Sequence, residues 1–217
     1  MVKDNELSPD VQEGSNHSVI TPQEIDAIGE ILNISMGSAA TAISTMLDRQ
    51  VVITTPQVNV RKFQMIDLSG WEPAMLVSIK YIEGIIGKTM MVFHKNDVQM
   101  IINMLMGIDA GPREDFEFDE LSMSAACEVM NQMMGSSATA LSSFFDKRID
   151  ISTPVADIIE TEEEFRKIVG IDADDDIVSV SFRMTIQGIL DTEFINIMPF
   201  ELAKTLAVQA LGQDSLS

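Results

Sequence analysis

The sequence is poor in residues that build many catalytic and structural sites: it has one cysteine, two histidines, one tryptophan and one tyrosine. Cys127 alone cannot form an intramolecular disulfide, and neither histidine has a third metal ligand or a nucleophile near it in the sequence. No apolar run reaches the roughly 18 residues of a membrane-spanning helix, and the N-terminus carries no secretory-type leader. We therefore expect a cytoplasmic protein with no metal site of its own and no insertion into the membrane.

Basic residues are also scarce, 14 against 34 acidic ones, which gives a formal net charge of −20. A field of that sign disfavours nucleic acid and anionic membrane as partners and favours solubility or a basic partner surface. Much of the charge lies in residues 160–176, where ETEEEFRK and DADDD predict a solvated acidic loop. DADDD lacks the glycine and the terminal glutamate of a calcium loop. With 46% hydrophobic residues, the 217-residue chain can still bury a sizeable core.

The main positive feature of the sequence is an internal repeat. The segment EILNISMGSAATAIS almost reappears as EVMNQMMGSSATALS, and a shift of 98 positions aligns the two without a gap. The residues that coincide under this shift include the pairs Glu30 and Glu128, Asn33 and Asn131, Gly37 and Gly135, and Pro56 and Pro154. Two halves, at about 20–108 and 117–212, therefore predict one pseudo-two-fold domain over 20–217, which follows a flexible tail at 1–19.

Each half is expected to fold as helix, three strands and helix. The predicted helices span about 22–48, 96–106, 119–147 and 199–211. The predicted strands span about 50–60, 74–82, 86–94, 149–159, 177–187 and 190–198. Pro56 and Pro154 are expected at a strand edge or bulge, because proline cannot donate to a sheet ladder. The predicted fold class is α+β, with two long antiparallel helices packed on a mostly antiparallel sheet.

The two long helices are predicted to be amphipathic in the same way. At 100° per residue, one stripe of each helix is apolar and should face the core. These stripes consist of Ile25, Ile28, Leu32, Met36, Ala39, Ile43 and Met46, and of Met123, Ala126, Met130, Met134, Leu141 and Phe144. The opposite, solvent-facing sides carry Asp26, Glu30, Asn33 and Gly37, and Ser124, Glu128, Asn131 and Gly135. Cys127 falls at the edge of the apolar stripe, which is typical of an unreactive thiol.

A glutamate and an asparagine three residues apart are neighbours on a helix surface. Any exposed helix carries such residues, so one isolated pair would mean little, but core packing does not explain why both halves keep the pair. A carboxylate and an amide cannot break a strong bond alone. The amide can, however, orient water for in-line attack on a phosphoryl group whose metal another protein supplies. The carboxylate can accept a lysine of that protein.

The longer spacing in the two copies is Asp26-x3-Glu30-x2-Asn33-x22-Pro56 and Ser124-x3-Glu128-x2-Asn131-x22-Pro154. Both copies match the D/S-x3-E-x2-N-x22-P pattern of the CheC/FliY-type chemotaxis phosphatases, which the sequence resembles over about residues 20–211. The resemblance implies hydrolysis of the aspartyl phosphate of the response regulator CheY in bacterial chemotaxis. It also implies a location in the cytoplasm at the face of the flagellar basal body.

The resemblance further assigns a role to each residue of the pattern by position. It implies water-orienting Asn33 and Asn131, lysine-anchoring Glu30 and Glu128, supporting Asp26 and Ser124, and strand-shaping Pro56 and Pro154. The Mg²⁺ of the reaction would belong to CheY, so no cofactor is expected on this chain. The flagellar members normally add a C-terminal sheet domain, and the sequence leaves open whether such a domain follows residue 217.

An alternative from a different functional class is a non-catalytic module of the same fold. Such a module would pack into the flagellar switch with FliM, FliN or FliG, or dock to the deamidase CheD, and would use the Glu/Asn face only for contact. A purely structural relative has no reason to keep the Glu-x-x-Asn pair in both halves, which favours the enzyme. Flagellar members also tend to begin with a CheY-capturing peptide. The similar string Glu24–Ala27 lies inside the first predicted helix, so whether 1–19 binds CheY stays open.

Overall fold

Two long helices carry the repeated segments. The computed structural model, which describes residues 19–54, 57–113 and 115–214, places them at α1 (Pro22–Leu47) and α3 (Glu120–Phe144). Thr21 caps α1 in a reciprocal capping box with Glu24, and Asp119 caps α3 by accepting from the backbone N–H of Ser122. Both helices therefore start within two residues of the predicted positions, and both end slightly earlier than predicted.

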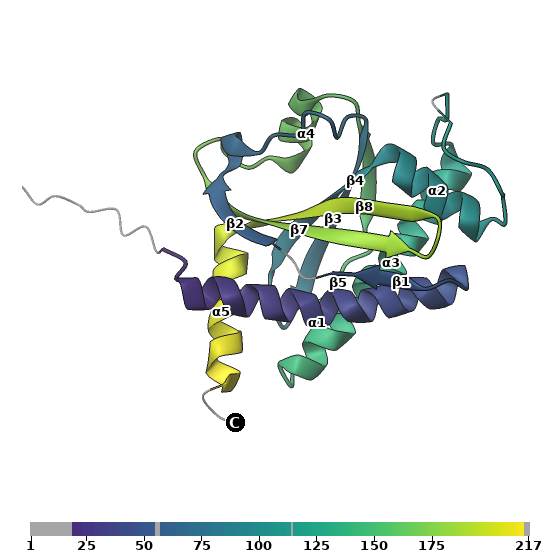
Figure 1. Cartoon of the computed structure of the whole chain (residues 1–217). Helices are drawn as coiled ribbons and strands as arrows, with labels where there is room; N and C mark the ends of the chain where they lie inside the picture. Colours follow the sequence, from purple (N-terminus) through teal and green to yellow (C-terminus); the bar gives the residue numbers. More distant parts are fainter. Residues whose placement is uncertain (1–18, 55–56, 114, 215–217) are drawn as a thin grey trace, which may run out of the picture.

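The other elements follow in the order that the repeat predicts, with a 3₁₀ turn and a short helix in addition. They are β1 (Val51–Ile53), β2 (Gln57–Lys62), the 3₁₀ turn η1 (Phe63–Met65), β3 (Ala74–Glu83), β4 (Gly87–His94), α2 (Lys95–Leu105), β5 (Asp150–Ile151), β6 (Val155–Ile159), α4 (Glu162–Val169), β7 (Asp176–Ile186), β8 (Leu190–Pro199) and α5 (Phe200–Asp214). The strands form one sheet, in which every described pairing is antiparallel (Figure 1). The predicted α+β class is confirmed.

The predicted strands at 50–60 and 149–159 are each divided into two, so the prediction of three strands per half was wrong. Pro154 is buried between β5 and β6, where its missing N–H interrupts the ladder. The equivalent break between β1 and β2 contains residues 55–56, which lie outside the described part of the chain. The structure therefore does not test the prediction for Pro56.

The halves of the repeat exchange these edge strands. β1 and β2 of the first half pair with β7 of the second, whereas β5 and β6 of the second half pair with β3 of the first. The repeat relates Gln57 of β2 to Val155 of β6. Gln57 lies opposite Ser181 of β7, and Val155 lies opposite Ser78 of β3, so the two pairings are equivalent. β4 and β8 meet in the middle of the sheet. Each half contributes its own hairpin, β3–β4 or β7–β8, and the edge strands of the other half complete the sheet around it.

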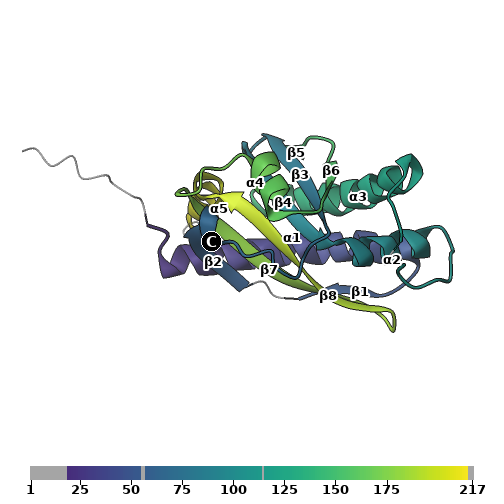
Figure 2. The same cartoon turned by 90° about the horizontal axis from the view of Figure 1, so that it is seen from above.

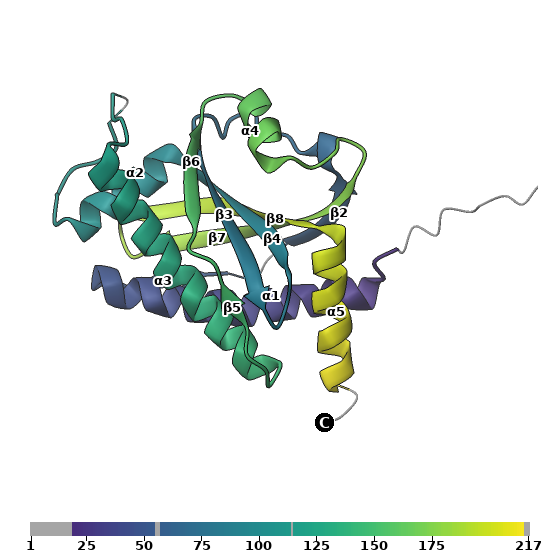
Figure 3. The same cartoon turned by 180° about the vertical axis from the view of Figure 1, so that it is seen from behind.

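Helices α1 and α3 lie side by side against one face of the sheet and cross (Figures 2 and 3). At the crossing the Oγ atoms of Ser38 and Ser136 are 3.3 Å apart, and these two serines are equivalent in the repeat. The predicted apolar stripes lie in the core between helices and sheet, although Ile25, Met46, Met123 and Phe144 are only half-buried. The pseudo-two-fold axis therefore passes through the contact between the two helices.

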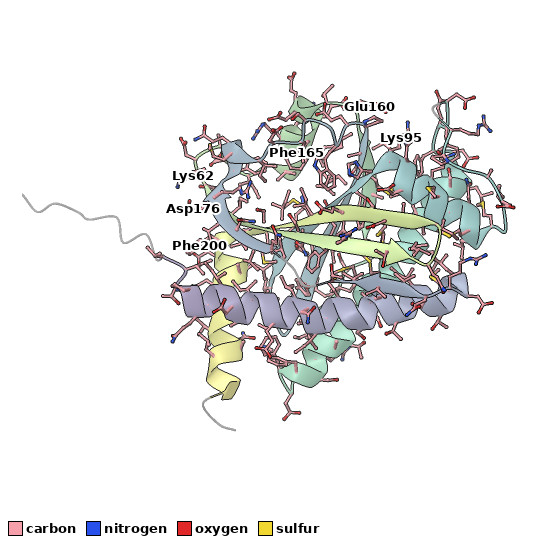
Figure 4. The ribbon with its side chains drawn as sticks, in the orientation of Figure 1. Lys62, Lys95, Glu160, Phe165, Asp176 and Phe200 are labelled. Carbon is pink, nitrogen blue, oxygen red and sulfur yellow. The ribbon has the colours of Figure 1, made fainter. Side chains whose placement is uncertain are left out.

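The acidic segment 160–176 is not the predicted solvated loop. It contains α4, which covers the opposite face of the sheet from α1 and α3 (Figure 1). Phe165 of α4 is fully buried and packs against Phe63 with ring centroids 5.7 Å apart. Figure 4 labels Phe165, and also Lys62 and Asp176, whose side chains form an ion pair of 2.9 Å between β2 and β7. Phe165 and Val169 of this charged segment thus belong to a second, smaller apolar core.

Ser137 supplies a prediction about stability. It is 1% exposed, and its hydroxyl has no hydrogen-bond partner among the described residues, whereas the equivalent residue of α1 is Ala39. Ser137→Ala should raise the free energy of unfolding by about 1 kcal/mol, because an unsatisfied hydroxyl is removed and alanine is a better helix former. Urea unfolding measures this change. In the control Ser142→Ala, which removes a bonded hydroxyl that holds the N–H of Ile149 at 2.9 Å, the sign should be reversed.

Candidate functional site

The polar residues of the repeated pattern lie on the solvent-facing sides of α1 and α3. Asp26, Glu30, Asn33, Ser124, Glu128 and Asn131 are all exposed. Gly37 is also exposed, and its equivalent Gly135 is half-buried. The predicted orientation of both helices is therefore confirmed. The helix period brings the members of each set onto one side, and the opposite apolar stripe holds that side outward.

The two Glu/Asn pairs are related by the pseudo-two-fold axis. Asn33 precedes Ser38, and Asn131 precedes Ser136, by the same number of residues. A rise of 1.5 Å per residue places each asparagine about 7.5 Å along its helix from the crossing. Because the helices run in opposite senses across the crossing (Figure 3), the pairs lie on opposite sides of the axis. The two pairs are therefore two separate candidate sites, not one composite site.

The carboxylates of the two sites differ in their hydrogen bonding. Glu128 Oε1 accepts a hydrogen bond of 2.8 Å from Nε2 of Gln132, one turn later in α3. The equivalent neighbour of Glu30 is Ile34, which is 41% exposed and cannot donate from its side chain. Neither Asn33 nor Asn131 has a side-chain hydrogen bond to another described residue. Sequence analysis missed this difference, although the spacing from Glu128 to Gln132 is that of facing residues on a helix.

A partly buried ion pair holds the N-terminal turn of α1, close to the first site. Lys204 of α5 donates to Glu24 at 2.7 Å and to the carbonyl oxygen of Val19 at 3.0 Å. The hydrogen bond from Lys204, helped by the N–H of Thr21, keeps the pKa of Glu24 below its ordinary value of 4.5 against the opposing effect of burial. In α3 the equivalent residue is Ser122, whose side chain hydrogen-bonds to the N-cap residue Asp119 and to no other described residue. The two helices are thus anchored differently.

Replacing Lys204 by methionine should lower the free energy of unfolding near neutral pH by about 1.5–3 kcal/mol, because a charged hydrogen bond is lost and Glu24 stays buried. The folded-state pKa of Glu24 is depressed, so the stabilisation is complete above about pH 4.5 and is lost as the pH falls through the folded-state pKa. Urea unfolding of both proteins on either side of pH 4.5 checks this. An equal difference at both pH values would contradict the assignment.

The exposure of both sites indicates what kind of substrate could use them. A cavity of about 490 Å³ lies elsewhere, between the C-terminal end of α1, α2 and the loop after it, and none of the six predicted side chains lines it. Within the described residues no group of three or more His, Cys, Asp and Glu could hold a metal ion. A carboxylate and an amide on an open helix surface suit contact with a macromolecule better than enclosure of a small one.

The matches to known proteins fall on the same segments. The model of the CheC-like family matches residues 24–60 and 121–158, which are the two long helices and the strands after them. Flagellar motor switch phosphatase FliY of Bacillus subtilis (strain 168) is 38% identical over 196 residues, 90% of this chain and 51% of that protein. The crystal structure of Thermotoga maritima FliY superposes with a TM-score of 0.80 at 36% identity, over 89% of this chain and 98% of that one.

The chain belongs to the CheC/FliY family. It spans about half the length of the curated FliY that it matches. The FliM middle domain of Helicobacter pylori shares the fold at a TM-score of 0.66 and 11% identity, over 88% of this chain and 99% of that one. At this identity the likeness concerns the fold alone. The CheC/FliY match therefore rests on FliY and on the family model, which covers the Glu-x-x-Asn pair in both halves.

Two parts of the family resemblance concern the N-terminal region of the chain. The expected tail, residues 1–19, lies outside the described part of the chain except for Val19, which is exposed and accepts from Lys204. Glu24–Ala27, the string similar to a CheY-capturing peptide, lies inside α1, and Glu24 there is buried. No helix of the described residues is both long and apolar enough to cross a membrane.

Proposed function

We propose that this chain hydrolyses the aspartyl phosphate of the response regulator CheY, with one site on α1 and one on α3. The observation that supports this most is the repetition of an exposed Glu-x-x-Asn pair at equivalent positions of two helices, each with an unpaired amide. A helix surface under no functional constraint has no need of the same acid and amide in both copies. The FliY relative from Bacillus subtilis bears the name of a flagellar motor switch phosphatase, which supports the same activity.

In the proposed reaction, the side-chain oxygen of Asn33 or Asn131 accepts a hydrogen bond from a water molecule and places it in line with the phosphorus atom. The water oxygen forms the new bond to phosphorus, the bond to the aspartyl oxygen breaks, and the products are the free carboxylate and inorganic phosphate. Glu30 or Glu128 binds a lysine of the regulator and so fixes its position. The Mg²⁺ on CheY would stabilise the charge of the phosphoryl oxygens.

Asp26 and Ser124 are proposed to support the two sites, since each is exposed one helical turn before the glutamate. Pro154 is proposed to act only on the shape of the strand after α3, because it is buried in the break between β5 and β6. We propose that the protein works at the flagellar switch, in contact with switch proteins such as FliM, FliN and FliG. The deamidase CheD is a further proposed partner.

The test is the rate of phosphate loss from Mg²⁺-bound phospho-CheY with and without this chain. We expect the chain to accelerate the loss, and we expect Asn33→Ala and Asn131→Ala, each alone, to leave part of the acceleration. If a folded chain binds phospho-CheY and leaves the rate unchanged, the enzyme is excluded. The same face would then be assigned to an adaptor or switch module.

Gln132 gives a prediction about the difference between the two sites. It occupies the carboxylate of Glu128 that a partner's lysine would need, so removing it should strengthen binding at the α3 site. In a chain whose α1 site is silenced by Asn33→Ala, Gln132→Ala should lower the phospho-CheY concentration for half-maximal rate about twofold, the scale of an intrahelical pair. Ile34→Ala in the Asn131→Ala background is the matched control without such competition. Weaker binding after Gln132→Ala would show that the glutamine contacts the partner instead.

A further inference from the structure

Gly37 and Gly135 stand one helical turn beyond the two site asparagines, about 6 Å further along the helix axis. Both lie in the interior of a long helix and on the side of the Glu/Asn pair. Glycine is the poorest helix former apart from proline, because it loses the most backbone freedom when the helix forms. A chain that keeps glycine at the same interior position of both helices therefore needs a reason for it.

The described structure contains no such reason. Neither glycine has a positive φ, the backbone conformation that would require glycine. A Cβ atom added at Gly37 or Gly135 would meet no described atom within 4 Å, even though the crossing of α1 and α3 lies at the next residue of each helix. Thr41 donates a hydrogen bond of 3.0 Å to the carbonyl oxygen of Gly37, which any residue could accept equally well. The described fold would thus accept alanine at both positions.

Gly29 shows how a helix glycine without a repeated role behaves. It also lies inside α1, and a Cβ atom there would make an ordinary contact of 3.7 Å with Val58. The equivalent residue of α3 is Cys127, so the second copy does carry a side chain at this position. Gly29 is thus present in one half alone, whereas the glycine at Gly37 and Gly135 is present in both halves.

We propose that Gly37 and Gly135 are positioning residues of the two sites, and that the missing Cβ lets the partner's loop, whose aspartate side chain carries the phosphate, approach the helix. The inference rests on the proposed function, because the approaching group is the loop that carries the aspartyl phosphate. A water molecule held by the asparagine must reach the phosphorus atom in line, so the helix and this loop come close together beside the amide. A methyl group at the glycine position, one turn from the asparagine, would keep the loop too far from the amide.

The test is the double variant Gly37→Ala/Gly135→Ala in the otherwise unchanged chain. Its melting temperature should rise by about 2–4 °C per substitution, because alanine is the better helix former in a domain of this size. The rate of phosphate loss at saturating phospho-CheY should nevertheless fall at least about tenfold, because a small misplacement of reacting atoms has a large effect on rate. A gain in stability together with a loss of rate is not expected from a residue that only builds the fold.

Gly29→Ala is the matched control. It makes the same substitution in α1 and should keep the rate of the parent chain. If Gly37→Ala/Gly135→Ala stays within twofold of the parent rate, or melts at a lower temperature than the parent, the inference is overturned while the proposed function stands. If the parent chain itself gives no acceleration of phosphate loss from phospho-CheY, the proposed function fails and the inference fails with it.

Discussion

Asn33→Ala/Asn131→Ala is expected to abolish the acceleration of phosphate loss from phospho-CheY, with a fall of about a hundredfold or more in rate. Each substitution removes the amide that we propose to orient the water, and neither removes a packing contact, since both side chains are exposed. The melting temperature should therefore stay close to that of the parent chain. The measurement is the single-exponential loss of labelled phosphate at equal concentrations of variant and parent.

Binding separates this prediction from a simple loss of docking. The double variant keeps Glu30 and Glu128, so it should still bind phospho-CheY with an affinity within a few-fold of the parent. Asn96→Ala removes another exposed asparagine, on α2, and serves as the matched control with full activity. A double variant that binds and still accelerates hydrolysis would show that the amides do not place the water.

Phe165→Ala is expected to have the largest effect on stability, a loss of about 3–5 kcal/mol in the free energy of unfolding. The ring is fully buried between α4 and the sheet, next to Phe63, so its removal leaves a cavity in the smaller of the two cores. For a chain of this size the melting temperature should fall on the order of 10 °C. Thermal unfolding followed by circular dichroism measures it.

The matched control for Phe165→Ala is Ile168→Ala on the same helix. Ile168 is 36% exposed, so its truncation should change the free energy of unfolding by less than about 1 kcal/mol. The face that carries Glu30 and Asn33 lies on the other side of the sheet from α4 (Figure 1), so Phe165→Ala should keep its activity at temperatures where it is folded. Equal and small effects of both substitutions would contradict the burial of Phe165 and support the solvated loop that the sequence predicted.

The segment around Phe165 contains sequence features of a helix, but its high charge led to a different prediction. Thr161 caps α4 by accepting from the N–H of Glu164, and Gly170 ends the helix in the left-handed region at φ 65°. A threonine followed three residues later by glutamate, an apolar pair at Phe165 and Val169, and a closing glycine are all readable from sequence. The run of acids led instead to the prediction of a loop.

The faces of α1 and α3 were predictable because helix period is a local property of the chain. The pairing of β1 and β2 with β7 was not predictable, because the choice of a strand partner far away in the sequence produces no periodic pattern in the chain. The contact between Glu24 and Lys204 is of the same non-local kind. The chemical role of each site residue depends on a partner that the chain meets from outside, so neither periodicity nor packing tests it.

The measurement that tests the central claim most directly is the amount of phosphate released when phospho-CheY is in molar excess over this chain. Our account predicts faster release than from phospho-CheY alone, with more than one phosphate released per chain, because neither asparagine is consumed. It also predicts that the acceleration is absent with Asn33→Ala/Asn131→Ala at concentrations where that variant is bound. Release at the rate of phospho-CheY alone, from a folded and bound parent chain, would contradict the account.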